Sequence, residues 1–347
     1  MVAEWLANGR RLHVAPEAIT VKEVIARFWI YAAQYYRDAD GVVSHELENI
    51  RYALKPVKEL FSDLPAEKFG PRALRAVREK MIASKLCRVH INARIGRIKR
   101  VFKWAASEEL IRGETYHALL SVDGLRCGRC AARESQPIRP VPQDHVEAIQ
   151  PFVSRQVWAI IQLQLFTGAR AGEITIMRPV DIDMSGRIWV YTPARHKTAH
   201  HGHERKVYIG PRGQEVLRTF LQRRLDAFCF SPVEAEAERR AALHARRKTP
   251  LSCGNRPGTN RREAPQRKPG EFYKVKAYRN AINQACKKSG VPSWHPHQLR
   301  HNAATFLRKE FGLETARIIL GHRSAAITTI YAEADQQKAI EAMLRVG

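Results

Sequence analysis

The sequence predicts a mainly α-helical protein with a small β-hairpin or sheet, an α+β class, divided into two domains. Apolar residues recur at helical spacing through most of the chain. A short stretch between residues 188 and 209 has instead the pattern of two strands. Near residue 130 the periodicity stops and glycine, arginine and proline accumulate, which is typical of a linker. With 347 residues, the chain is long enough for two domains of ordinary size.

The first domain is predicted to be helical and to occupy residues 1–125. A helix is expected over residues 21–37, and a second one follows Ser44, whose side chain can cap it. A third helix begins at Pro71, since proline is favoured as the first residue of a helix.

The next helix, over residues 88–106, has an apolar stripe on one face and cations on the others. The stripe is formed by Ile91, Ile95, Ile98 and Phe102, and the cations are Arg88, Arg94, Arg97, Lys99, Arg100 and Lys103. A solvated surface helix would also expose such cations. However, acidic residues are nearly absent between positions 80 and 107, so pairing along the helix is disfavoured. We therefore predict that these cations contact DNA phosphates.

The second domain is predicted to span residues 143–347, after a linker over residues 126–142. Ser154 caps a buried helix that ends at Gly168. Two strands then flank a polar loop and form a hairpin. Further helices are expected at residues 213–228, 273–289, 298–311, 314–320 and 325–344. A basic insertion over residues 231–270 interrupts them; its first part can be helical, and we expect the segment to be mobile without DNA.

The charge of the chain favours a polyanionic partner. Lys and Arg number 59 against 34 Asp and Glu, so the formal net charge is +25. The excess positive charges repel one another, and such an excess is usually retained where a polyanion balances it. Double-stranded DNA is preferred over an anionic membrane surface, although a merely basic protein would fit the charge alone. No stretch approaches the roughly 20 apolar residues of a membrane span, and no signal peptide is recognised. We expect a cytoplasmic, nucleoid-associated protein.

Metal binding is disfavoured by the pattern of cysteines and histidines. Cys127 and Cys130 lie close together, but a zinc ribbon needs a second such pair. A histidine cluster in the polar loop of the hairpin is interpreted as a phosphate contact, because a basic loop offers no convergent, supported ligands; it comprises His196, His200, His201 and His203. We expect neither a metal ion nor a small-molecule cofactor.

Residues suited to phosphodiester chemistry are concentrated in the second domain. Arg170 lies in the sequence Thr-Gly-Ala-Arg-Ala-Gly-Glu and Arg300 in His-Gln-Leu-Arg-His. A guanidinium matches two phosphate oxygens and can neutralise them. His297 lies three positions before Arg300, so both side chains can point into one pocket, and His322 offers a second proton carrier. Tyr331 is the candidate nucleophile, whose phenol needs nearby cations or a base.

Other residues are expected to support this set. Glu173 lies one helical turn after Arg170 and is more suited to orienting an arginine than to acting as a base. His301 can buttress the site. Lys197 and Lys206 both lie near the hairpin loop, and either could protonate the departing 5′-oxygen; Lys206 opens the returning strand.

The order of these residues resembles the tyrosine recombinase (phage integrase) family. The resemblance covers six positions, Arg170, Lys197, His297, Arg300, His322 and Tyr331, and the context Arg-His-Lys-Thr favours Lys197 over Lys206. The helical first half is similar to the family's core-binding domain in size and charge only. The insertion is longer than in the simplest members, and no separate arm-binding domain is visible.

The resemblance implies a core-binding and a catalytic domain that form a C-shaped clamp around DNA. It implies a site-specific recombinase or integrase, in which the tyrosine attacks a phosphodiester to give a 3′-phosphotyrosyl bond and a free 5′-hydroxyl. Neither ATP nor metal is needed, and four protomers act on two DNA sites through a Holliday junction. Integration of a mobile element and resolution of chromosome dimers both stay open.

Two other functions are compatible with parts of this pattern. A type IB topoisomerase would use much the same residues and would act alone on DNA. A non-catalytic DNA-binding regulator could descend from a recombinase, but it would be expected to have lost at least one of the six residues.

Overall fold

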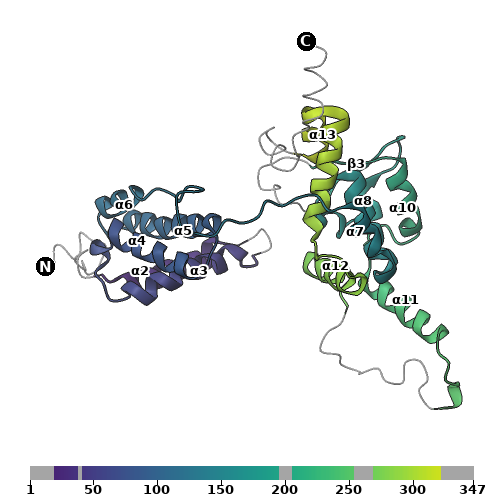
Figure 1. Ribbon diagram of the computed structural model, residues 1–347, viewed down its shortest axis with the longest axis horizontal. Coiled ribbons are helices and arrows are strands. Elements are labelled where there is room, and N and C mark those ends of the chain that lie inside the picture. The colour runs from purple at the N-terminus through teal and green to yellow at the C-terminus, as the bar shows by residue number, and fades with distance from the viewer. Residues whose placement is uncertain (1–18, 38–40, 195–204, 254–268, 322–347) are drawn as a thin grey trace, which may run out of the picture. The chain divides into compact units, whose positions relative to one another are not determined.

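The computed structural model describes residues 19–37, 41–194, 205–253 and 269–321. The chain divides into two compact units, Met1–Pro137 and Ile138–Gly347 (Figure 1). This division falls inside the segment 126–142 that the sequence predicts as a linker. Each unit has its own apolar core. The fold is mainly helical with one small antiparallel sheet, as predicted.

Helices form the first unit, and their caps follow the sequence. Thr20 and Glu23 make a capping box at the start of the first described helix, and the Ser44 side chain accepts a hydrogen bond from the Glu46 amide. Pro71 is the first residue of its helix, as predicted. The elements are α2 (Val21–Tyr35), α3 (His45–Phe61), η2 (Ala66–Lys68), α4 (Pro71–Ala83), α5 (Arg88–Ser107) and α6 (Gly113–Leu120).

The core of this unit is built around α5. The predicted stripe of Ile91, Ile95, Ile98 and Phe102 is buried. The Phe102 ring stacks on Phe69, with centroids 4.7 Å apart. The helix therefore faces α3, α4 and α6 with its apolar side.

The second unit is organised around the buried helix α8 (Arg155–Thr167), which packs against α10, α13 and β3. Its start and end are those predicted from Ser154 and Gly168. The Ser154 side chain accepts from the Val157 amide, and Gly168 ends the helix with a φ of 64°. The other helices are α7 (Gln143–Ala148), η3 (Gln150–Phe152), α9 (Ala171–Ile174), η4 (Pro179–Asp181), α10 (Pro211–Leu221), α11 (Pro232–Ala245), η6 (Leu251–Cys253), α12 (Val275–Ser289) and α13 (Pro296–Leu320).

The sheet contains the predicted hairpin and one strand more. β2 (Trp189–Tyr191) and β3 (Val207–Ile209) pair antiparallel with Tyr191 opposite Val207. β1 (Ile182–Asp183) adds to the free edge of β2. The sequence pattern misses β1 because two residues are too few to show an alternation of apolar and polar side chains. The hairpin loop, residues 195–204, lies outside the described residues.

Three predicted helices of the second unit differ from those observed. α10 ends at Leu221 instead of residue 228, because Arg223 donates to the carbonyls of Phe220 and Phe228 and holds an irregular turn. The two helices expected at 298–311 and 314–320 join in one element, α13, which is kinked at Gly312, where φ is 83°. The helix expected at 325–344 lies outside the described residues.

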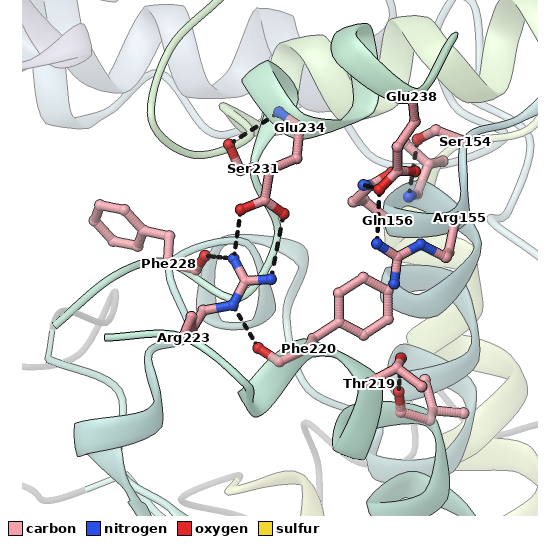
Figure 2. Close-up of polar contacts among 12 residues, drawn as sticks. Ser154, Arg155, Gln156, Thr219, Phe220, Arg223, Phe228, Ser231, Glu234 and Glu238 are labelled. Carbon is pink, nitrogen blue, oxygen red and sulfur yellow. Dashed lines mark hydrogen bonds and ion pairs between the residues drawn. The ribbon is translucent and has the colours of Figure 1, made fainter. Parts of the chain in front are cut away.

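The first half of the insertion contains a helix, as its sequence allows, and the first turns of that helix make polar contacts with the rest of the second unit. Ser231 precedes α11 and caps it, because its side chain accepts from the Glu234 amide. Its acidic side chains hold it to the unit: Glu234 accepts from Arg223, and Glu238 accepts from Arg155 and Gln156 (Figure 2). Residues 254–268 lie outside the described part. No described helix has the length and apolar character that crossing a membrane would require.

Candidate active site

The Thr-Gly-Ala-Arg motif forms the corner between α8 and α9. The Thr167 hydroxyl donates to the Leu163 carbonyl at 2.6 Å and accepts from the Ala169 amide at 3.2 Å. Gly168 is left-handed, and a Cβ there would lie 2.5 Å from Leu320. Only glycine fits such a position without strain. The corner thus brings Arg170, the residue before α9, close to the end of α13.

Glu173 holds Arg170 in place. Its carboxylate is buried and accepts from the Arg170 amide at 3.0 Å and from the Arg170 guanidinium at 2.8 Å. Arg205 lies on its other side, with an Nε to Oε2 distance of 3.5 Å. Burial by itself would raise the pKa of Glu173, but the two arginines outweigh it and hold the pKa below its usual value. The orienting role predicted for Glu173 agrees with this geometry.

Arg300 is fully buried and joins two segments that are distant in sequence. Its Nη1 donates to the Gly168 carbonyl at 2.6 Å, and its Nη2 donates to the Leu320 carbonyl at 2.7 Å. The Leu320 carbonyl is at the C-terminal end of α13, where the last carbonyls have no partner within the helix and attract cations. Arg300 is therefore held by the same corner that places Arg170.

Arg205 is a buried arginine that the sequence analysis missed. Its side chain is 6% exposed, and its Nη1 donates to the carbonyls of Ile319 and Lys206. No motif surrounds it, and its place just before β3 gives no sign of a contact with Ile319 of α13, which is 114 residues away. Lys206, its neighbour, has an exposed side chain.

His297 and His301 lie on the first turns of α13, beside Arg300. Their rings meet edge to face with centroids 5.6 Å apart. His301 is buried. Burial, aided by the positive charges of His301, Arg300, His295 and Arg170, lowers the pKa of His297 from 6.5 to about 4. The His297 imidazole is therefore neutral near pH 7 and able to accept a proton.

The structure brings together five of the predicted site residues. Arg170, Glu173, His297, Arg300 and His301 lie around the junction of α8, α9 and α13. The other three predicted residues, Lys197, His322 and Tyr331, lie outside the described residues. Two fixed guanidinium groups next to a neutral imidazole form a site suited to a phosphate diester, whose charge the arginines can neutralise.

Three arginines of α5 have acidic partners elsewhere in the first unit, whereas the prediction considered only pairing along the helix. Arg97 and Arg100 both donate to Glu46 of α3, and Arg88 donates to Glu134. These acids are distant in sequence, so the acid-free stretch around α5 did not reveal them.

The remaining members of the predicted DNA-contact list differ from one another. The ammonium group of Lys99 donates to the Val122 carbonyl at 2.6 Å. The Arg94 guanidinium lies 5.8 Å from the centre of the Tyr52 ring. Lys103 is exposed. Of these three side chains, it is the one most accessible to the predicted phosphate.

Two regions of the sequence could be considered for metal binding, the Cys127–Cys130 pair and the histidines of the hairpin loop. Among the described residues, no group of three or more His, Cys, Asp or Glu could hold a metal ion. Cys127 is exposed and Cys130 is half-buried. The histidines at 196, 200, 201 and 203 lie outside the described part.

Known proteins match this chain over its second unit and in its fold. Residues 141–338 match the Phage integrase family. Over 200 residues, 57% of this chain, it is 28% identical to tyrosine recombinase XerC from Bifidobacterium longum (strain DJO10A), and the match spans about half (48%) of that protein.

Two solved structures have a similar fold. A lambda integrase dimer bound to a COC′ core site has a TM-score of 0.63 at 15% identity, covering 91% of this chain and 96% of that chain. A lambda integrase tetramer bound to a Holliday junction has a TM-score of 0.62 at 14% identity, covering 95% of this chain and 84% of that chain. The family match covers more than half of the chain and includes every predicted catalytic position. This chain belongs to the phage integrase family.

Proposed function

We propose that this protein is a tyrosine site-specific recombinase that cleaves and rejoins DNA through a 3′-phosphotyrosyl intermediate. The observation that carries the proposal is the buried Arg300, which is tied both to the corner preceding Arg170 and to the end of α13. Two guanidinium groups are thus held in place before a phosphate arrives. A phosphodiester resists attack mainly because of its negative charge, so such preorganised cations are what its cleavage requires.

Arg170 and Arg300 bind the non-bridging oxygens of the scissile phosphate in this mechanism. Arg170 is the more accessible of the two, with 24% of its side chain exposed, while Glu173 fixes its direction. The Tyr331 oxygen attacks phosphorus, and the bond to the 5′-oxygen breaks. The phenol proton passes to His297, which is neutral at pH 7.

The remaining roles follow from the requirements of the leaving group. Lys197 donates a proton to the departing 5′-oxygen, and His322 donates a hydrogen bond to the phosphate. The free 5′-hydroxyl of a partner strand then attacks the phosphotyrosine and releases Tyr331. The energy of the broken bond is kept in the protein–DNA bond, so neither ATP nor a metal ion takes part.

The partners that we propose are double-stranded DNA and further copies of this chain. We assign the first unit to core binding and the second to catalysis. A tetramer on synapsed sites is supported by the similar fold of lambda integrase, whose tetramer was solved on a Holliday junction. Among the cations predicted to contact DNA, Arg100 and Lys103 of α5 are exposed.

A nicked suicide substrate made from the DNA flanking the gene tests this function. The nick lets a short fragment diffuse away after cleavage, so the covalent protein–DNA adduct accumulates. We expect an adduct with the wild type and none with Tyr331→Phe. Tyr208→Phe is a matched control, because Tyr208 is an exposed tyrosine of β3, and it should form the adduct normally.

The same preparation distinguishes a recombinase from a topoisomerase. A recombinase joins strands from two DNA sites and gives a recombinant product. Relaxation of supercoiled plasmid by the monomer, without any recombinant product, would identify a type IB topoisomerase. An adduct that persists in Tyr331→Phe would refute the mechanism altogether.

A further inference from the structure

Arg205 occupies the space between the carboxylate of Glu173 and the last turn of α13. Its Nε lies 3.5 Å from Glu173 Oε2, and its Nη1 donates to the Ile319 carbonyl at 3.0 Å. The neighbouring carbonyl, that of Leu320, accepts from Arg300 at 2.7 Å. Two successive carbonyls at the end of α13 are therefore held by two buried arginines that come from different segments.

The residue that follows the helix is packed against Arg205. Gly321 ends α13 in the left-handed conformation, with φ 66° and ψ 47°. A Cβ on Gly321 would lie 2.6 Å from Arg205 Nη1 and 3.1 Å from its Cζ. Glycine is thus required both by the backbone angle and by the guanidinium beside it.

Glu173 is the link from Arg205 to Arg170. The carboxylate contacts Arg205 with one oxygen and the Arg170 guanidinium with the other. A lysine in place of Arg205 would keep the charge but could not span Glu173 and Ile319 together, because its ammonium is a single point on a flexible chain.

We propose that Arg205 is a positioning residue for DNA cleavage: it holds Glu173, and through it Arg170, at a fixed place relative to the end of α13. This inference rests on the proposed recombinase function. Arg205 itself touches no reacting atom in it. Its effect is to keep the guanidinium of Arg170 in register with Arg300, which is bound to the same helix end.

The charged and titratable groups around Glu173 determine how the loss of Arg205 would change the pKa of Glu173. Arg170 faces it from the start of α9, Arg205 from the residue before β3, and the Tyr191 hydroxyl of β2 donates to its backbone carbonyl. Burial raises the pKa of Tyr191 above its usual value, so it stays neutral. Among the described residues, removing the Arg205 charge leaves the buried carboxylate with Arg170 as its paired cation, and the pKa of Glu173 rises.

The test is single-turnover cleavage of the nicked substrate, measured from acidic to neutral pH. At pH 7.5 we expect Arg205→Gln to cleave about 100-fold more slowly than the wild type, the loss typical of a misplaced catalytic group. Its DNA Kd should stay within about threefold, since the DNA-facing charges are unchanged. The acid limb of its pH–rate profile should move to higher pH, where Glu173 becomes protonated.

Two further variants separate positioning from general stability. Arg205→Lys keeps a charge near Glu173, so it should slow cleavage while leaving the acid limb close to that of the wild type. In the double variant Glu173→Gln, Arg205→Gln the shifted limb should be absent, and the rate should be no lower than that of the slower single variant. Arg224→Gln, which neutralises an arginine whose side chain is 83% exposed, is the control.

The outcomes distinguish this inference from the proposed function. Failure of the wild type to form an adduct would refute the recombinase. Normal adduct formation by the wild type, together with cleavage by Arg205→Gln within twofold of it and an unmoved acid limb, would refute the role of Arg205. If Arg205→Gln does not fold, the rate and pH profile of Arg205→Lys decide, because a rate equal to that of the wild type contradicts the positioning role.

Discussion

At the scale of single residues, Arg300 and Arg205 are cations whose positions are fixed before any phosphate is bound. Carbonyl groups of α13 and of the α8–α9 corner accept their hydrogen bonds. In the proposed mechanism, the Arg300 guanidinium is already oriented when the charged substrate binds, so little reorganisation is required, and its charge stabilises developing charge more strongly than it would in water. The same burial influences the histidine beside them.

His297 should titrate far below an ordinary histidine in the free protein. Burial, together with the charges of His301 and Arg300, lowers its pKa to about 4. NMR of the imidazole resonances should therefore show His297 neutral down to about pH 5. Binding of a DNA phosphate should raise this pKa, because a negative charge favours imidazolium. A free-protein pKa at or above 6.5 would contradict the geometry of the site.

The lowered pKa of His297 also makes the free energy of unfolding depend on pH. Because the pKa of His297 is lower in the folded state than in the unfolded state, the unfolded chain binds more protons between about pH 4 and 6.5. The free energy of unfolding therefore decreases as the pH falls through that range. His297→Gln should lose less stability over the same range, and it also assigns the NMR resonance.

Gly168 should not tolerate a side chain. Gly168→Ala introduces a Cβ 2.5 Å from Leu320 in a left-handed backbone, so backbone strain and overpacking add to about 2–5 kcal/mol of destabilisation. Gly290→Ala is the matched control, since Gly290 is also left-handed but has no atom within 4 Å of the added Cβ. Equal losses in chemical denaturation would show that the contact with Leu320 does not matter.

At the scale of elements, α11 is held to the second unit by polar contacts at its first turns. Arg223 donates to the carbonyls of Phe220 and Phe228 and to Glu234, and only 12% of its side chain is exposed (Figure 2). Partly buried carbonyls that lose their donor are costly. The start of α11 and the end of α10 should therefore depend on this one side chain.

Arg223→Ala should lower the free energy of unfolding by about 2–4 kcal/mol, because two carbonyls and a carboxylate lose their partner. Hydrogen exchange of α11 should accelerate at the same time. Arg224→Ala is the adjacent control, because its pair with Asp226 is exposed on both sides, and it should leave stability unchanged. Similar effects of the two variants would contradict the anchoring role of Arg223.

Most elements could be predicted from sequence because their signals are local. The caps at Ser44 and Ser154, the first-turn proline at Pro71 and the left-handed Gly168 each act within a few residues. Contacts between distant segments gave no such signal. The contact of Arg205 with α13 and the contact of Glu46 with α5 are both of this kind. The sequence pattern therefore did not reveal Arg205, and α5 was interpreted as a helix without acidic partners.

At the scale of the whole molecule, the net charge of +25 should dominate DNA affinity. Cations that neutralise phosphates release counterions, so affinity decreases steeply with salt. We expect the Kd for duplex DNA to rise on the order of 1,000-fold between 50 and 200 mM salt, with circular dichroism unchanged over the same range. A Kd that hardly depends on salt would mean that the excess charge faces something other than DNA.

The sequence motifs indicated which residues belong to the candidate site, but they did not indicate the contacts that hold those residues in place. Arg170, Glu173, His297, Arg300 and His301 were recognised from their motifs, and the structure gathers them at one junction. The arrangement that supports them is invisible in the sequence, because it consists of side chains bonded to carbonyls far along the chain. The catalytic and supporting roles of all five, like those of Lys197, His322 and Tyr331, remain predictions.

The chemical identity of the protein–DNA bond tests the central claim most directly. The adduct formed on the nicked substrate would be digested with protease and nuclease, and the linked peptide sequenced by mass spectrometry. We predict a nucleotide joined through its 3′-phosphate to the peptide that contains Tyr331, and a free 5′-hydroxyl on the released strand. A 5′-phosphate linkage, or attachment to any other residue, would contradict the account.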